Sequence, residues 1–135
     1  MRRVRTTPRS TYNPIIDQTT GRPRGPAAAF EPRFPNPAKP EKIVDEALSV
    51  NVESSLRAAG LPLTWEADPR KHYVARITVA DCTSQELEAH LHPLPENPHH
   101  GLVWGLVEMF GNDRDRYERA IGALARASTI VPFNT

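Results

Sequence analysis

The clearest periodic pattern lies near the end of the chain, where apolar residues recur every three or four positions between Asn112 and about Ala127. This spacing places them on one face of an α-helix, and the acidic residues at its start favour the positive end of the helix dipole. The sequence therefore predicts a helix over 112–127 and, after it, an edge strand over 129–133, where Pro132 is tolerated. The inner face of the helix would consist of Tyr117, Ala120, Ile121 and Leu124.

A second helix is predicted over residues 41–59. Pro40 suits the first helical position, and Gly60 follows the last one. The apolar residues between them again follow helical spacing and would form a buried stripe. They are Val44, Ala47, Leu48, Val52, Leu56 and Ala59.

Between these helices the pattern changes to strict alternation of apolar and polar positions. Residues 61–67 and 73–79 both alternate in this way, which is the period of a half-buried strand. The Asp-Pro-Arg-Lys connector at 68–71 has turn chemistry. The sequence thus predicts an antiparallel hairpin.

Two shorter helices complete the predicted body. Thr83 and Glu86 have the spacing of a capping box, which predicts a helix that begins at Thr83 and ends by Pro93. Residues 98–110 follow an Asn-Pro pair and precede a glycine, as a helix does. A buried strand is the alternative for 98–110, because this stretch is apolar on all sides.

Gly101 and Gly105 form a G-x-x-x-G pattern within the stretch predicted as helix. In a membrane this pattern lets two helices approach closely, but the apolar run here is about half the length that a membrane span needs. We expect instead that the glycines allow close packing against the helix over 112–127.

The first part of the chain has a different character. Eight of the 14 prolines lie in residues 1–40, and each one fixes φ and removes a hydrogen-bond donor, so neither a helix nor a central strand can propagate. The large apolar residues are too scattered to offset the entropy of ordering. This segment is predicted to be an extended arm that is mobile when alone.

Charge divides the chain at the same place. The net charge of +1 combines +6 for residues 1–40 with −5 for residues 41–135. The sequence therefore predicts an extended basic arm rich in proline and arginine, residues 1–40, before a small acidic α+β domain, residues 41–135. That domain would hold about four helices, a β-hairpin and the C-terminal edge strand.

Composition excludes several classes of protein. A chain of 135 residues is most simply one domain, and no run reaches the roughly 18–20 apolar residues of a membrane span. Cys82 is the only cysteine, which excludes an intrachain disulfide and fits a reducing compartment. Arg2 and Arg3 are not followed by the apolar stretch of a secretory signal. We expect a cytoplasmic or virion-associated protein that is not secreted through a cleaved signal peptide.

Histidines offer the main candidate chemistry. Four of them lie within 11 residues, but their spacing is not the i,i+4 arrangement of a helical metal pair. Solvated loop histidines are therefore the favoured interpretation, and no metal or cofactor is expected. Cys82 is more simply a buried thiol than a nucleophile. The weak metal candidates are His90, His92, His99 and His100.

The function predicted from these patterns is non-enzymatic. The arm combines cations with anchor-sized apolar residues, a mixture that suits docking into a multi-subunit assembly such as a virion, a ribonucleoprotein or a secretion-type complex. The expected partners are other protein subunits, copies of the same chain among them, with nucleic acid as an alternative partner and no membrane. The predicted partner-binding residues are Arg2, Arg3, Arg5, Arg9, Tyr12, Ile15, Ile16, Arg22, Arg24, Phe30, Arg33 and Phe34.

Two alternatives stay open at this point. A small intracellular hydrolase or nuclease-like toxin could use the histidines between His90 and His100 as acid and base, because the ordinary pKa of histidine lies near neutrality. An inhibitor or immunity-type protein could act through the acidic body. No nucleotide-binding loop or serine-hydrolase motif supports another enzyme class.

Overall fold

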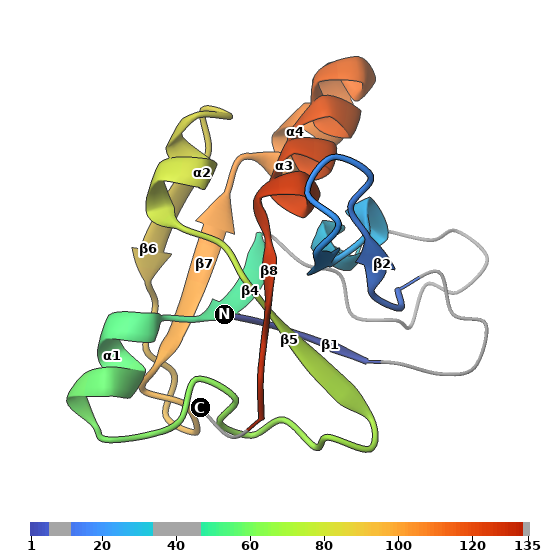
Figure 1. Cartoon of the computed structure of the whole chain (residues 1–135). Coiled ribbons are helices and arrows are strands. Elements are labelled where there is room, and N and C mark those ends of the chain that lie inside the picture. Colours follow the sequence, from blue (N-terminus) through green and yellow to red (C-terminus); the bar gives the residue numbers. More distant parts are fainter. Residues whose placement is uncertain (6–11, 34–46, 134–135) are drawn as a thin grey trace, which may run out of the picture.

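The computed structural model describes residues 1–5, 12–33 and 47–133, which form one small α+β domain (Figure 1). The described residues contain four α-helices, one 3₁₀ helix and three small antiparallel sheets. The predicted α+β class is thereby confirmed. In chain order the elements are β1 (Arg2–Arg5), β2 (Ile15–Ile16), β3 (Pro23–Arg24), η1 (Ala27–Phe30), β4 (Leu48–Asn51), α1 (Glu53–Ala58), β5 (His72–Arg76), α2 (Val79–Thr83), β6 (Glu88–Leu91), β7 (His100–Trp104), α3 (Leu106–Asn112), α4 (Arg114–Ala127) and β8 (Thr129–Val131).

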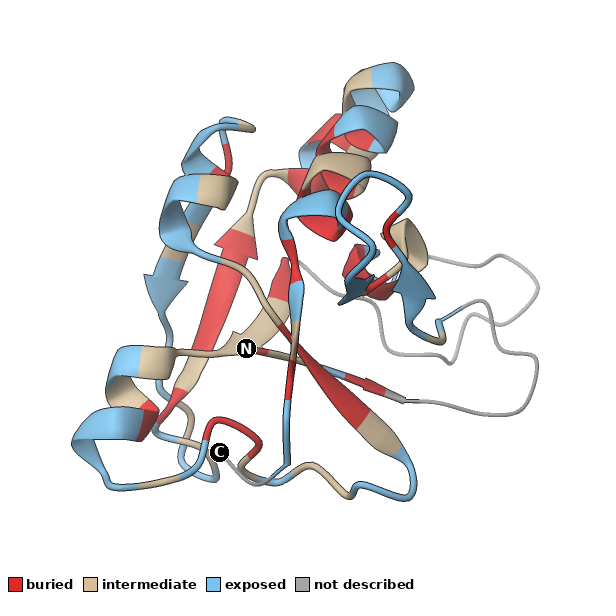
Figure 2. Ribbon diagram, viewed as in Figure 1, coloured by how far each residue is buried: buried red, intermediate tan, exposed pale blue. Residues whose placement is uncertain are grey.

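Helix α4 is the element that the sequence predicts best. Asp113 is its N-cap, and the Asp113 carboxylate accepts a hydrogen bond from the backbone N–H of Arg116 at 3.1 Å. This bond satisfies one of the donors that a helix start leaves open. All four residues predicted for the inner face are buried, while other positions of the helix are exposed, and Figure 2 shows this mixture of buried and exposed segments along α4. The strand predicted after it is also confirmed, because β8 is an outer strand of its sheet.

The first sheet has the order β1-β5-β8. Strand β1 pairs antiparallel with β5, with Val4 opposite Tyr73, and β8 pairs with the other edge of β5. The pairing of residues 2–5 with the body was not predicted from the residues of this segment. The pairing is compatible with the sequence because the first proline is Pro8, so nothing in this stretch prevents a ladder of hydrogen bonds.

The hairpin predicted over 61–79 does not form. Residues 61–67 make turns, with the N–H of Trp65 donating to the carbonyl of Pro62 at 3.0 Å. Their apolar side chains pack into a small core cluster, so alternation here reflects a folded loop. The connector at 68–71 is a turn, as predicted, but it leads into β5, which pairs with strands from the two ends of the chain.

The second sheet has the order β4-β7-β6 and corrects the helix predicted over 41–59. Residues 48–51 form β4, and the helix α1 covers only Glu53–Ala58, while residues 41–46 lie outside the described ranges. Within β4 the apolar Leu48 and Val50 alternate with polar residues, and pairing with β7 selects this period of two over the helical spacing.

The helix predicted from Thr83 is also wrong. A different capping box, formed by Thr78 and Asp81, starts α2 five positions earlier, and α2 ends at Thr83. The Asp81 N–H donates to the Thr78 hydroxyl oxygen at 3.0 Å, and the Thr78 N–H donates to the Asp81 carboxylate at 2.8 Å. Glu86 then has a positive φ of 60°, which redirects the chain into strand β6.

Residues 98–110 divide between the two structures considered for them. Residues 100–104 form the strand β7, which agrees with the buried strand considered as the alternative for this stretch. Helix α3 starts only at Leu106. Gly101 lies in the strand, where an added Cβ would stand 2.7 Å from Val52 Cγ2. Gly105 is the N-cap of α3 with φ 121°. The two glycines therefore serve a sheet surface and a helix start, and the predicted helix–helix packing through them is wrong.

The main core lies between α4, the two three-stranded sheets and η1. Phe30 of η1 has no exposed surface, and it joins Leu48, Val103 and the buried face of α4. A smaller cluster around Leu56 covers the other face of the β1-β5-β8 sheet. Residues 1–5 and 12–33 thus pack on the body (Figure 2). The domain boundary at residue 40 stays a prediction, since residues 34–46 are not described.

Candidate interaction surface

The β2–β3 hairpin is the most distinctive structure in the basic N-terminal part. Ile15 pairs with Arg24 and Ile16 with Pro23, and residues 17–22 form the loop between the strands. Two backbone hydrogen bonds close this loop, from the N–H of Asp17 to the carbonyl of Arg22 at 2.9 Å and from the N–H of Gly21 to the carbonyl of Asp17 at 2.8 Å. Gly21 has φ 71°, a conformation that glycine adopts at low cost.

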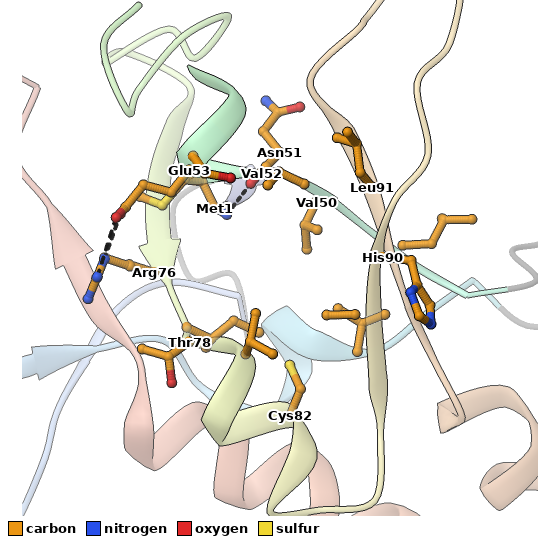
Figure 3. Close-up of a pocket in the computed structure, with 16 residues that line it drawn as sticks. Met1, Val50, Asn51, Val52, Glu53, Arg76, Thr78, Cys82, His90 and Leu91 are labelled. Carbon is orange, nitrogen blue, oxygen red and sulfur yellow. Dashed lines mark hydrogen bonds and ion pairs between the residues drawn. The ribbon is translucent and has the colours of Figure 1, made fainter. Parts of the chain in front are cut away.

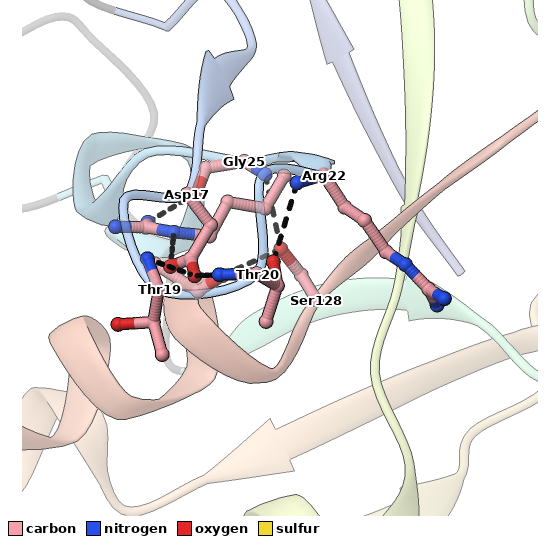
Figure 4. A network of polar contacts seen from close by, with 8 residues as sticks. Asp17, Thr19, Thr20, Arg22, Gly25 and Ser128 are labelled. Carbon is pink, nitrogen blue, oxygen red and sulfur yellow. Dashed lines mark hydrogen bonds and ion pairs between the residues drawn. The ribbon is translucent and has the colours of Figure 1, made fainter.

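The Asp17 carboxylate organises the loop from within (Figure 4). Asp17 Oδ2 accepts hydrogen bonds from the backbone N–H groups of Thr19 at 3.1 Å and Thr20 at 2.8 Å. Asp17 Oδ1 accepts a hydrogen bond from Arg24 Nε at 2.9 Å. This contact is an ion pair that joins the residue after β2 to strand β3. The Thr20 backbone N–H, followed by the Arg24 side chain, lowers the pKa of Asp17 below its ordinary value.

The hairpin is also tied to the body of the protein. The N–H of Gly25 donates to the Ser128 hydroxyl at 3.0 Å, and that hydroxyl donates to the carbonyl of Ala125 at 2.8 Å. At its other end the Tyr73 hydroxyl of β5 donates to the carbonyl of Tyr12 at 2.5 Å. The hairpin therefore has a defined position relative to α4 and β5.

Large apolar side chains on this hairpin face the solvent. Tyr12 is 46% exposed, Ile15 41% and Ile16 62%. Arg22, in the loop of the same hairpin, is also exposed. Successive residues of a strand point to opposite faces, so Ile15 and Ile16 offer apolar contacts on both faces of the hairpin, and large exposed apolar side chains of this kind are what protein interfaces use. We call Tyr12, Ile15, Ile16 and Arg22 the hairpin patch.

The other predicted partner-binding residues have different surroundings. Arg2 donates to the carbonyls of Ala29 at 3.1 Å and Ser49 at 2.8 Å, which joins η1 and β4. Arg3 is exposed and donates to the carbonyl of Glu66 at 2.6 Å. Arg24 pairs with Asp17, as described above.

Phe30 is fully buried in the core, so it does not face a partner in this structure. Arg33 is exposed. Nothing is described for the side chain of Arg5, and Arg9 and Phe34 lie outside the described residues. Of the apolar anchors predicted from the sequence, Tyr12, Ile15 and Ile16 are therefore the three that lie on the surface.

The four clustered histidines do not converge on one point. His99 is buried, with its Nδ1 2.8 Å from the Ser55 hydroxyl and its ring edge-on to Trp65 at 5.1 Å. His92 and His100 have ring centroids 5.5 Å apart on the exposed side of the second sheet. His90 lies 3.4 Å from Glu88. Within the described residues, no three metal-ligating side chains are grouped as a metal ion requires.

Cys82 is buried in α2, and burial raises the pKa of its thiol to about 11. The thiol is therefore protonated at neutral pH, which is the unreactive form. Its sulfur lines a cavity of about 310 Å³ between α2, β4, β6 and the end of β5 (Figure 3).

The walls of this cavity are mainly apolar, with Val50 and Val103 of the second sheet among them. At its rim Arg76 Nε donates to Glu53 Oε1 at 2.7 Å (Figure 3). This Arg76 side chain is the main cause that lowers the pKa of Glu53. The Met1 amino group donates to the carbonyl of Asn51 at 2.5 Å, and burial lowers its pKa to about 6. The cavity can hold an apolar group beside a neutralised ion pair.

A second hollow of about 370 Å³ is more polar and lies along β1 and the loop before β7. Arg2 and Asn97 contribute to it, but both are already bonded within the protein. Asn97 Nδ2 donates to Asn51 Oδ1 at 2.8 Å, and Asn97 Oδ1 accepts from the N–H of His99 at 3.0 Å. These side chains have a structural role in the second sheet.

Asp17 and Ser128, which hold the hairpin in place, are not among the functional residues predicted from the sequence. A signal for Asp17 is present, because an aspartate followed by Thr-Thr-Gly is typical of a turn that the aspartate side chain closes. No local signal marks Ser128, whose partner Gly25 lies 103 positions away in the chain.

Comparison with models of known protein families, with curated proteins and with solved structures gives no match to this chain. In the described part of the chain, none of the helices has the length and apolar character to cross a bilayer. Function is therefore inferred from the surfaces themselves.

Proposed function

We propose that this is a non-enzymatic interaction protein that docks into a multi-subunit assembly through the hairpin patch. The observation that carries the proposal is the exposure of Tyr12, Ile15 and Ile16, at 46%, 41% and 62%, on a hairpin that Asp17 holds in shape. A patch that is already ordered loses little conformational entropy when it binds, so more of the contact energy appears as affinity.

The chemistry of the patch indicates the kind of partner. Ile15 and Ile16 require an apolar surface, and the exposed Arg22 guanidinium favours a carboxylate at its edge. A folded protein subunit offers both. Burial of one isoleucine side chain contributes about 1.5–3 kcal/mol, which corresponds to roughly 10- to 150-fold in affinity.

Two features of the histidine and cysteine residues support this proposal over the hydrolase alternative. His99 is held by Ser55 and Trp65, so it is not directed toward a substrate position, and the Cys82 thiol is protonated. His100 lines the polar hollow along β1, but its Nδ1 already lies 3.0 Å from the carbonyl oxygen of His92, and the His92 side chain is exposed.

Photo-crosslinking in cells that produce the protein tests the proposal. A photoreactive amino acid at position 16 is expected to crosslink to a small set of protein subunits, whereas the same group at position 133 is not. Phe133 is the control because it is also a large apolar residue on the surface, 37% exposed, and it follows β8. Ile16→Asp should reduce co-purification of the crosslinked subunit at least tenfold.

The folded state must survive these changes for the comparison to hold. Because Ile16 is exposed, Ile16→Asp should change the free energy of unfolding by no more than about 0.5 kcal/mol. Equal crosslinking from positions 16 and 133, or unchanged co-purification of Ile16→Asp, would contradict docking through the hairpin patch.

A further inference from the structure

Strand β6 forms an outer edge of the second sheet. It pairs with β7 on one side, with Ala89 opposite Val103 and Leu91 opposite Gly101, and the described residues place no strand on its other side. Figure 1 shows β6 on the left of the molecule, away from the β2–β3 hairpin on the right. An outer strand of this kind offers a row of backbone groups that a further strand can bind.

The ladder with β7 determines which groups these are. The N–H of His92 donates to the carbonyl of His100 at 2.8 Å, which continues the same register by one pair. In an antiparallel ladder, hydrogen-bonded pairs alternate with pairs that are not hydrogen-bonded. His90 and His92 therefore bond toward β7, while the N–H and carbonyl groups of Ala89 and Leu91 point away from the sheet.

The side chains of these two residues lie on the cavity side of the sheet. Leu91 is 53% exposed, and Val79 of α2, which lines the same cavity, is 66% exposed. The edge thus combines outward backbone groups with an apolar strip at the cavity mouth. The opposite face of β6 carries Glu88 and His90, whose side chains are 77% and 60% exposed.

We propose that a second copy of this chain pairs with β6 in antiparallel orientation, about a two-fold axis that passes beside His90. In this arrangement Ala89 lies opposite Leu91 of the partner subunit, and Leu91 lies opposite the partner's Ala89. Four hydrogen bonds then join the two strands, and the two sheets become one sheet of six strands.

The ends of β6 select this register. Leu87 cannot donate outward, because its N–H already donates to the carbonyl of Cys82 at 2.9 Å. Pro93 has no N–H at all. A shift in either direction brings one of these residues opposite Ala89 or Leu91 and leaves a carbonyl without a donor. Only the pairing of Ala89 with the partner's Leu91 satisfies every outward N–H and carbonyl group of both residues in both copies.

The side chains fit the same register. Glu88 lies opposite His92 of the partner subunit on the exposed face, and the symmetry repeats this pair, so a carboxylate meets an imidazole twice. On the cavity face the small Ala89 lies opposite the larger Leu91 of the partner subunit. Cross-strand pairs that hydrogen-bond to each other or are of complementary size stabilise antiparallel sheets.

The second copy also completes the cavity. The partner's Leu91 lies beside Ala89 at the mouth, on the side where Val79 is exposed, and reduces the apolar surface left in water. The interface consists of one short strand from each copy, so it belongs to the small, weak class of protein interfaces. We expect a dimer that forms at high protein concentration and presents two hairpin patches.

Single cysteines in the full chain test the register directly. His90 lies opposite the partner's His90 in a pair that is not hydrogen-bonded, where the Cα atoms are about 4.5 Å apart, a distance that a disulfide spans. Under mild oxidation His90→Cys should form a covalent dimer. Glu88→Cys and His92→Cys should each stay monomeric alone and form a mixed dimer when combined. The natural chain is the control and should form no covalent dimer, because its own cysteine, Cys82, is buried.

Sedimentation over a range of concentrations gives an independent measurement. Leu91→Asp should weaken dimer formation at least tenfold, while Ile16→Asp should leave it unchanged. These two variants separate this inference from the proposed docking function, which depends on Ile16. Both residues are exposed, so circular dichroism should show the natural fold for each variant.

Three results would overturn the inference. The first is a His90→Cys protein that stays monomeric at the highest concentration reached. The second is equal crosslinking of all three cysteine variants, which would mean random collision. The third is a dimer that joins positions 90 and 92, which would show another register.

Discussion

Phe30 fills the space between η1 and α4 and has no exposed surface. Replacement of a fully buried phenylalanine by alanine removes its transfer energy and leaves a cavity, at a cost of about 3–5 kcal/mol. We predict a loss of this size for Phe30→Ala in the free energy of unfolding measured with denaturant. Ile16→Ala, at a 62% exposed position, should change it by less than about 0.5 kcal/mol. Similar values for the two variants would mean that Phe30 is not part of the core.

Gly105 is the second residue whose environment permits a clear prediction. Its φ of 121° is unfavourable for other residues, and an added Cβ would lie 2.8 Å from Leu87 Cδ2. Gly105→Ala should therefore lower the free energy of unfolding by about 1–3 kcal/mol.

Gly111 is the matched control for this substitution, because it lies inside α3 with nothing within 4 Å of an added Cβ. Gly111→Ala should raise the stability by about 0.4–1 kcal/mol, since alanine reduces the entropy of the unfolded chain. Thermal unfolding of the two variants should shift in opposite directions, and a shared direction would contradict the conformation described for Gly105.

At the scale of elements, the β2–β3 hairpin depends on one carboxylate. The pKa of Asp17 is lowered, first by the Thr20 N–H and then by Arg24, so the folded hairpin prefers the charged form. Its contribution is present above the ordinary aspartate pKa and is lost as the pH falls through the lowered value. We predict that amide exchange at Thr20, followed by NMR, accelerates in that acidic range.

Asp17→Ala provides the comparison for this pH dependence. In that variant Thr20 should exchange quickly at every pH, because the acceptor is gone, while amides of α4 keep their protection. A natural protein whose Thr20 amide exchanges at a rate independent of Asp17 titration would contradict the network in Figure 4.

Short elements also explain which sequence predictions succeeded. Helix α4 has 14 residues, a capping aspartate and a full apolar face, so local signals agree over four turns. The strands around it have five residues or fewer. Over such lengths helical and strand spacing can fit the same apolar residues, as at Leu48 and Val50, and the pairing partner decides between them.

At the scale of the whole molecule, the two ends of the chain meet on β5. Strand β1 holds one edge of β5 and β8 holds the other, and both Met1 and Val4 are buried. We predict that deletion of residues 1–5 lowers the free energy of unfolding by at least about 3 kcal/mol, because two buried side chains and a strand ladder are lost. Thermal unfolding measures this loss.

The substitution Arg3→Gln is the control for that deletion, since Arg3 is an exposed residue of the same strand. It should leave the unfolding temperature within a few degrees of the natural value. If the deleted chain unfolded at the same temperature as the full chain, residues 1–5 would be a dispensable extension and not part of the sheet.

The amino-acid sequence by itself determined the α+β class, the helix α4 with its buried face and the final edge strand. Each of these follows from residues close together in the chain, such as a capping signal or an unbroken apolar period. Only the tertiary structure decided that residues 2–5 pair with β5, that Phe30 enters the core and that Ser128 holds the hairpin. These contacts join residues far apart in the sequence, and their energy depends on burial and pairing that no local pattern records.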